Sequence, residues 1–259
     1  GRNANVSTDC RVYGTASTSG SKKNAIVQPG QAIWSSLETE TTIQRGEATL
    51  KPLYLPDRLD FSLPATAVCL LTDDGSSVVA QLASRLTARG WKVVVISFPE
   101  TVLAPSPPDP AIDRVLLDDV SEAHLQQQLA TISQTYGSIA AFIHLHPKFD
   151  RQLQDESATA ILKHVFLMAK YLKRSLTEPA PFGRSAFLTV TRLDGQFGLK
   201  SASLTSADII SGGLFGLTKT LNLEWQQVFC RAVDIAPDRT AETVMQTGLQ
   251  ELYDPDRSI

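Results

Sequence analysis

The sequence predicts an α/β fold in which helices cover a doubly wound, mostly parallel sheet. Short apolar runs of strand length alternate with longer amphipathic segments of helical period. Two of these runs, residues 68–72 and 91–97, enclose one helical segment and so form a βαβ unit of about thirty residues. Such a unit makes a right-handed crossover in a parallel sheet. The 42% of hydrophobic residues in the 259-residue chain is enough for a buried core.

Charge and cysteine usage narrow the class of protein. The chain has 24 basic and 27 acidic residues and a formal charge of −3, which argues against nucleic acid as the main partner. It has neither an apolar run of about eighteen residues nor an opening signal peptide, so we expect a soluble, cytoplasmic protein. Cys10, Cys69 and Cys230 lack metal-binding spacing. We expect the last two to be buried free thiols, because they lie in apolar strand-like runs.

Residues 1–45 and 46–259 differ in composition. The first part is rich in Ser, Thr, Gly and Asn, which predicts a flexible linker. A long linker at the start leads us to expect that the chain belongs to a larger polypeptide. The second part is predicted to be the α/β domain. Residues 47–55 are its expected opening strand, placed at a sheet edge because a proline there removes no ladder hydrogen bond.

The other elements follow from periodicity and from capping residues. A helix is predicted over residues 76–89, and Gly90 ends it. Residues 104–110 are rich in proline and predict a surface loop in place of a crossover helix. The remaining strands are predicted at residues 112–117, 139–145, 186–190 and 230–237, and the remaining helices at 121–136, 156–176, from about 207, and 240–252.

Two of these helices have distinctive surfaces. The helix at 156–176 has one apolar stripe, and its basic side chains lie largely off that stripe. We interpret the basic side as a solvated face, with docking of an acidic carrier domain as the alternative. In the later helix, Gly212, Gly213 and Gly216 are expected to allow close packing against a neighbour.

Histidines do not predict a metal site in this sequence. We expect His144 and His146 to point to opposite faces of their strand, and His124 and His164 to lie on separate helices. No cluster of cysteines or carboxylates completes a ligand set, so we predict no metal-ligating residue.

The segment GGLFGLTKTLNLEW followed by VFCRAVDIAP resembles the ketoreductase region of polyketide synthases and, more closely, of polyunsaturated fatty acid synthases. The likeness covers about residues 47–259. It implies a Rossmann-like domain similar to the short-chain dehydrogenases. In the ketoreductases that it resembles, such a segment belongs to a structural half without catalytic activity.

The resemblance also implies where catalytic groups would stand. A short-chain dehydrogenase needs a tyrosine as proton donor and a lysine four residues later on the same helix face. Those positions fall on Ala207 and Ser211, and the supporting serine would fall near Leu193 or Asp194. Lys219 comes two turns too late to replace the lysine. We therefore predict no catalytic residue in this chain.

The nucleotide turn of the resembling family reads Thr-Gly-x-x-x-Gly-x-Gly, and its glycines let the backbone approach the pyrophosphate. Laid on this chain, the three glycine positions become Asp73, Ser77 and Val79. Asp73 and Asp74 would place carboxylates where a pyrophosphate would lie. Each like-charge contact would cost on the order of 4 kcal/mol. We interpret both carboxylates as parts of the turn and of the helix start. The domain is thus expected to be degenerate at the nucleotide site, with no cofactor-binding residue.

These observations predict a non-catalytic structural subdomain of a multidomain synthase. Its expected partner is an adjoining catalytic half that binds NADPH and reduces 3-ketoacyl groups, and an acyl carrier protein is a further candidate partner. Two alternatives remain open: a free-standing, degenerate Rossmann interaction module, and an active NADPH-dependent reductase with an unorthodox site.

Overall fold

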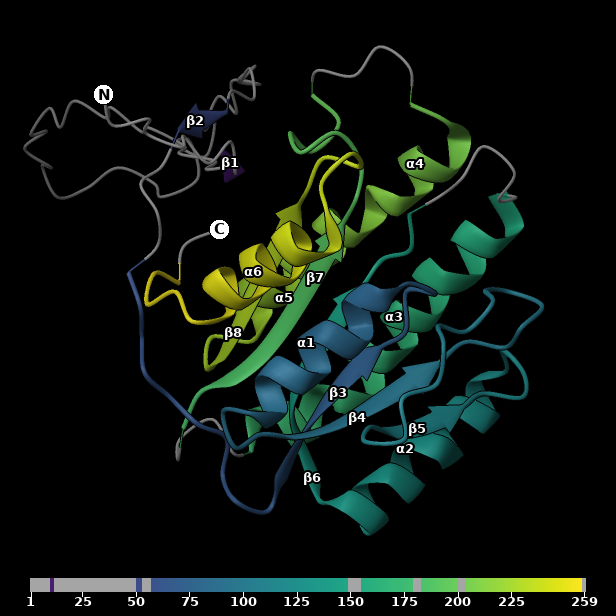
Figure 1. The fold of residues 1–259 in the computed structure, drawn as a ribbon, viewed down its shortest axis with the longest axis vertical. Coiled ribbons are helices and arrows are strands. Elements are labelled where there is room, and N and C mark those ends of the chain that lie inside the picture. The colour runs from purple at the N-terminus through teal and green to yellow at the C-terminus, as the bar shows by residue number, and fades with distance from the viewer. Residues whose placement is uncertain are drawn as a thin grey trace, which may run out of the picture.

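A computed structural model of the chain describes residues 10–11, 50–52, 57–148, 155–178, 183–199 and 204–257. Six strands form one sheet in the order β5-β4-β3-β6-β7-β8, and all of their pairings are parallel (Figure 1). From β3 the chain continues to β4 and β5 on one side of β3, and it then crosses to β6 on the other side. The topological switch point therefore lies between β3 and β6. This confirms the Rossmann-like α/β fold. The strands are β3 Ala67–Thr72, β4 Lys92–Ser97, β5 Asp113–Leu116, β6 Ser138–Leu145, β7 Ser185–Thr191 and β8 Val228–Asp234.

Helices cover both faces of this sheet (Figure 1). One apolar core joins the sheet to α2, α3 and α5, and a second joins it to α1 and α6. The sheet is therefore buried on both sides, which explains why its strands are near-continuous apolar runs. The helices are α1 Ser77–Thr87, α2 Glu122–Tyr136, α3 Asp155–Thr177, α4 Ser206–Ser211, α5 Gly213–Glu224 and α6 Ala241–Leu252.

Capping residues place the helix ends close to where the sequence predicts them. The side chains of Ser76, Ser121 and Thr240 each accept a hydrogen bond from a backbone amide in the first turn of α1, α2 and α6. Gly90 has φ of +82° and ends the turn after α1. The proline-rich segment forms no helix between β4 and β5, as predicted.

The glycine-containing helix differs from its prediction. It is divided into α4 and α5 at Gly212. A side chain on Gly213 would come within 3.0 Å of Leu162 on α3, so close packing is confirmed there. At Gly216 the prediction of close packing is wrong for the described residues, because outside the helix's own backbone none of their atoms lies within 4 Å of the position a Cβ would take.

The apolar stripe of α3 is confirmed, since its residues are almost fully buried and its basic residues are exposed. Those basic residues are Lys163, Lys170, Lys173 and Arg174.

Near the start of the chain, β1 Cys10–Arg11 pairs antiparallel with β2 Lys51–Pro52 in a separate two-stranded sheet. The described part of the expected opening strand therefore does not pair with the six-stranded sheet. Most of residues 1–45 lie outside the described residues, and the linker stays a prediction. Among the described residues, no helix combines the length and apolar character needed to cross a membrane.

Candidate functional site

Open α/β sheets bind ligands outside the carboxyl ends of their strands, at the switch point. In this chain the crevice between β3 and β6 is bridged by its own side chains. The Thr72 hydroxyl accepts a hydrogen bond from the Leu145 amide at 3.0 Å and lies 2.8 Å from His144 Nδ1. All three residues are buried. Internal hydrogen bonds thus join the carboxyl ends of β3 and β6 at the switch point.

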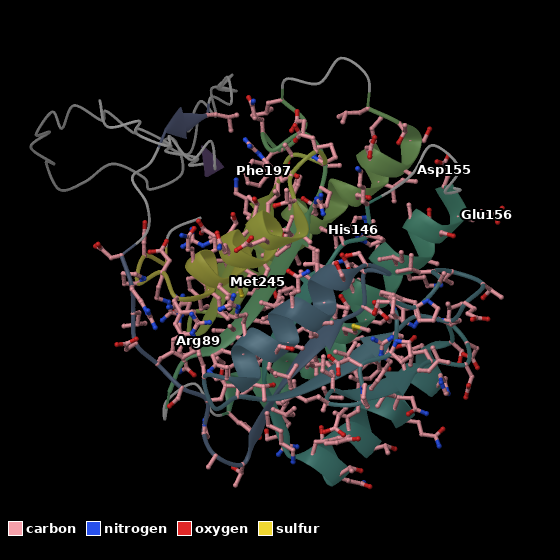
Figure 2. All side chains as sticks on the ribbon, viewed as in Figure 1. Arg89, His146, Asp155, Glu156, Phe197 and Met245 are labelled. Carbon is pink, nitrogen blue, oxygen red and sulfur yellow. The ribbon has the colours of Figure 1, made fainter. Side chains whose placement is uncertain are left out.

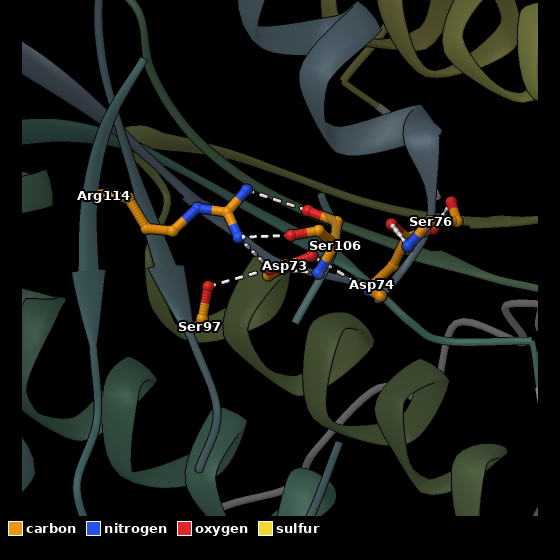
Figure 3. A network of polar contacts seen from close by, with 7 residues as sticks. Asp73, Asp74, Ser76, Ser97, Ser106 and Arg114 are labelled. Atoms are coloured by element: carbon orange, nitrogen blue, oxygen red, sulfur yellow. Dashed lines mark hydrogen bonds and ion pairs between the residues drawn. The ribbon is translucent and has the colours of Figure 1, made fainter. Parts of the chain in front are cut away.

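Asp73 occupies the centre of the predicted nucleotide turn and is fully buried. Its Oδ2 accepts hydrogen bonds from the Ser97 hydroxyl at 2.8 Å and the Ser106 amide at 3.0 Å. Arg114 Nη1 donates to the same oxygen at 3.0 Å (Figure 3). The Gly75 amide donates to Oδ1 at 2.9 Å. Both carboxylate oxygens are therefore engaged within the chain.

Asp74 forms the second part of the turn. Its carboxylate accepts hydrogen bonds from the amide and the hydroxyl of Ser76, at 3.1 and 2.7 Å (Figure 3). Burial raises the pKa of Asp74, although these hydrogen bonds oppose the shift. The prediction that Asp73 and Asp74 build the turn before α1 is confirmed. The first turn of α1 itself has no acidic residue, and Ser76 is its cap. We did not predict the arginine partner of Asp73; the signal available was a basic residue, Arg114, followed by apolar residues in a predicted strand.

The proline-rich segment covers this turn. Gly75 has φ of +75°, and a Cβ there would lie 2.9 Å from the carbonyl oxygen of Ala104. Ser106 is only 3% exposed, and its hydroxyl and carbonyl oxygens accept hydrogen bonds from Arg114 at 2.8 and 2.9 Å. The expectation of a surface loop is therefore wrong at Ser106. The Ala104 carbonyl oxygen and the Leu103 side chain therefore lie directly beside Gly75.

His144 and His146 correct a prediction made from the sequence. They lie on the same side of the sheet, and His144 Nε2 is 3.0 Å from His146 Nδ1. Alternate residues of a strand project from one face, so the expectation of opposite faces had the wrong parity. His146 Nε2 lies 2.6 Å from the Ser211 hydroxyl, which donates to the Ala207 carbonyl at 2.7 Å. His146, labelled in Figure 2, is only 3% exposed.

The two imidazoles are neutral at pH 7. Burial lowers the pKa of His146 to about 3, and burial together with His146 lowers the pKa of His144 well below its usual value. Since Ser211 uses its proton on Ala207, it accepts from His146, and the donation then runs from His144 to His146. A series of hydrogen bonds between uncharged side chains therefore connects Thr72 at the switch point to α4.

Metal ligands do not gather in this region. Across the residues that the structure describes, no three His, Cys, Asp or Glu side chains are placed to hold a metal ion. His124 and His164 lie on α2 and α3, as predicted. Cys69 and Cys230 are buried free thiols, and burial raises the pKa of both.

The positions at which the resemblance implies catalytic residues also lie at the carboxyl end of the sheet. Ala207 and Ser211 are both buried, one turn apart in α4. Ser211 binds His146 and Ala207 by hydrogen bonds, so it has a structural partner where the resembling enzymes carry a lysine. Lys219 is exposed on α5. No proton donor stands at the tyrosine position.

The supporting-serine position lies in a tightly held loop. Leu193 donates its amide to Asp234 at 2.8 Å, and Asp194 accepts hydrogen bonds from the amides of two residues that follow it. Asp234 is buried and also accepts from Thr191 and from the Phe197 amide. Burial is the main cause of its raised pKa. These carboxylates orient the backbone of the loop.

Comparison with known proteins agrees with this description of the fold. No family model matches the chain. Over 203 residues, 76% of the chain, it is 32% identical to one of the subunits of the polyunsaturated fatty acid synthase of Thraustochytrium sp.. The chain spans 7% of the length of that relative.

Two solved structures of similar fold are short-chain dehydrogenases/reductases. One from Serratia marcescens is 14% identical, with a TM-score of 0.52 over 74% of this chain and 91% of that one. An oxidoreductase of the same family from Aeromonas hydrophila is 16% identical, with a TM-score of 0.52 over 71% of this chain and 90% of that one. At these identities the likeness concerns the fold.

Proposed function

We propose that this chain is a non-catalytic structural subdomain of a ketoreductase. The proposal starts from its sequence similarity to part of a polyunsaturated fatty acid synthase and from its Rossmann-like fold, which resembles the short-chain dehydrogenases/reductases. It braces an adjoining half of the same polypeptide. That half binds NADPH and reduces 3-ketoacyl groups carried by the synthase.

The observation that carries this proposal is the closed nucleotide turn. Opening it for a pyrophosphate would expose Asp73, break its contacts with Arg114 and Ser106, and move the chain at Ala104. A dianionic pyrophosphate would also meet two carboxylates in place of free backbone amides. Both effects oppose cofactor binding.

The second support is the identity of the residues at the catalytic positions. Ala207 offers no proton, and the Ser211 hydroxyl is bonded to a neutral, buried imidazole. General acid catalysis needs a donor within hydrogen-bond reach of the substrate. The buried pair Ser211 and His146 has no such access.

Titration with NADPH tests the proposal, with nucleotide fluorescence as the signal. We expect no saturable binding to this chain at up to about 1 mM, and saturable binding once the chain is joined to the catalytic half of a synthase. An active short-chain dehydrogenase serves as the positive control. Stoichiometric NADPH binding by this chain alone would instead support the active-reductase alternative.

Restoring the missing catalytic pair provides a separate test. The double variant Ala207→Tyr with Ser211→Lys is expected to show no ketoreductase activity, because the nucleotide turn stays closed. Circular dichroism establishes whether it folds. A folded double variant that oxidises NADPH with a 3-ketoacyl thioester would contradict the scaffold proposal.

A carrier protein is a weaker candidate partner than the catalytic half. The basic side of α3 is the surface an acidic carrier would meet. However, Lys170 forms an ion pair with Glu122 at 2.7 Å, and Arg174 forms one with Glu178 at 2.6 Å. These pairs reduce the positive charge available to such a partner.

A further inference from the structure

A cavity lies at the amino edge of the sheet, at the opposite end from the nucleotide turn. Its volume is about 350 Å³, which is within the range of small-molecule pockets. The segment before β3, the turn after α1 and one face of α6 form its walls. Its lining residues include Arg58, Arg89, Gln246, Leu249, Gln250 and Tyr253. We call it the Arg58–Arg89 cavity, and Figure 2 labels Arg89.

Two arginines lie over the ring of Tyr253 in this cavity. The guanidinium carbon of Arg89 is 5.3 Å from the ring centre, and that of Arg58 is 6.0 Å from it. Since both are measured from one point, the two guanidinium groups are no more than about 11 Å apart. The Leu59 amide donates a hydrogen bond to the Tyr253 carbonyl at 2.7 Å. This bond holds the segment that carries Arg58 against the end of α6.

The donors of these side chains are largely unused within the described part of the chain. There the guanidinium of Arg89 has no ion pair or hydrogen bond, and its contact is the Tyr253 ring. Arg58 pairs with Asp60 at 3.4 Å, but the side chains are 67% and 91% exposed, so this pair contributes little. The Tyr253 hydroxyl is buried and has no hydrogen-bond partner among the described residues. Because a buried donor without an acceptor costs free energy, an acceptor from outside the chain would stabilise the site.

Charge and spacing indicate the class of ligand. An arginine binds a carboxylate through two parallel N–H···O bonds, with the guanidinium and carboxylate carbons about 4 Å apart. Two arginines up to about 11 Å apart can therefore each hold one carboxylate of a molecule whose carboxylate carbons are about 4 to 5 Å apart. Short aliphatic dicarboxylates have this separation. Gln246 and Gln250 offer further donors, and Leu249 offers an apolar contact.

We propose that the Arg58–Arg89 cavity binds a short aliphatic dicarboxylate, with one carboxylate on each arginine. The Tyr253 hydroxyl donates a further hydrogen bond to the ligand, and Leu249 contacts its methylene groups. Asp57, the one carboxylate among the lining residues, repels the ligand and limits its affinity. The site lies at the far end of the sheet from the nucleotide turn, so the proposal does not depend on the scaffold role.

An NMR titration of the nitrogen-labelled chain with glutarate tests this proposal. We expect saturable binding of one glutarate per chain with a Kd of about 1 mM. The Nε–H signals of Arg58 and Arg89 should shift during the titration, which locates the ligand. Butyrate has a similar length but one carboxylate, so it should bind at least about tenfold more weakly.

Variants of the lining residues test the role of each group. Arg89→Gln should reduce glutarate affinity at least about tenfold and remove most of the preference over butyrate. Tyr253→Phe keeps the ring and should weaken binding about threefold, whereas Asp57→Asn should tighten it about threefold. Arg85→Gln is the matched control. This exposed arginine lies one turn earlier on α1 and lines a different cavity, so its variant should bind glutarate as the wild-type chain does.

Three results would overturn the proposal. They are an absence of saturable glutarate binding up to about 20 mM, equal affinities for glutarate and butyrate, and a glutarate affinity that is unchanged in Arg89→Gln. The NMR spectrum of each variant shows whether it folds. Arg58→Gln repeats the test on the other arginine, at an exposed position outside the helices and strands, and the same loss is expected.

Discussion

The two halves of the sheet's carboxyl edge are held together by different kinds of interaction. Beside β3, β4 and β5, a buried carboxylate and an arginine form an ion pair supported by two serines. Beside β6 and α4, neutral imidazoles and hydroxyls form a hydrogen-bonded chain. The charged half depends on keeping both partners, because a lone buried charge is costly. The neutral half depends on pH, because protonation would place charge in the core.

Removing the charge of Asp73 should have the largest effect. Asp73→Asn is expected to lower the free energy of unfolding by about 3 kcal/mol, since it leaves Arg114 without its counter-ion. This value is at the low end for a buried pair, because the Arg114 side chain is 19% exposed and keeps its hydrogen bonds to Ser106. Urea denaturation monitored by circular dichroism measures it.

Asp74→Asn is the matched control for that variant. Asp74 is bonded to Ser76 rather than to an arginine, so its loss should cost about 1 kcal/mol. If both variants lost the same stability, the ion pair would not be what distinguishes the charged half.

The second largest effect should come from acid, which should lower the stability contributed by the neutral half, His144 and His146. The pKa values of His144 and His146 are lowered in the folded chain, so the unfolded chain binds protons below about pH 6.5 that the folded chain does not. Stability contributed by these groups is therefore present above pH 6.5 and is lost as the pH falls. From pH 7 to 5.5 the two histidines together should cost about 2.5 kcal/mol. Urea midpoints across this range measure the loss.

His146→Gln separates this effect from the rest of the chain. In this variant, stability should fall less steeply as the pH drops. The number of protons that the unfolded chain binds beyond the folded chain should be smaller by about one. The raised pKa values of Asp74 and Asp234 act in the opposite direction, but closer to pH 4, where carboxylates titrate. An unchanged slope in His146→Gln would show that this imidazole is not buried in its neutral form.

The fold was predictable because its signals are local. Ser76, Ser121 and Thr240 cap helices through their own first turns, and the apolar runs mark the strands. The glycine-poor turn also follows from residues adjacent in sequence. These parts need no knowledge of distant contacts.

The partners at the carboxyl edge were not predictable in the same way. Arg114 is 41 residues from Asp73, and Ser211 is 65 residues from His146. Only the strand order brings them together. The pairing of His144 with His146 could have been inferred, because residues two apart on a strand share a face. At Gly216 the small side chain suggested a close neighbour, but the part of the chain that the structure describes places none beside it.

The smallest expected effect comes from a change at Ser211, the last side chain in the series of neutral hydrogen-bonded groups. In Ser211→Ala, His146 loses its 2.6 Å hydrogen bond, at a cost of about 1.5 kcal/mol. Alanine favours a helix over serine by about 0.5 kcal/mol, so the net loss should be about 1 kcal/mol. Ser206→Ala, at an exposed position of the same helix, should change stability by less than about 0.5 kcal/mol.

Nitrogen NMR of His146 adds a direct readout. The wild-type imidazole should carry its proton on Nε2, and a proton on Nδ1 would reverse the direction of donation through the whole chain, from Ser211 towards Thr72.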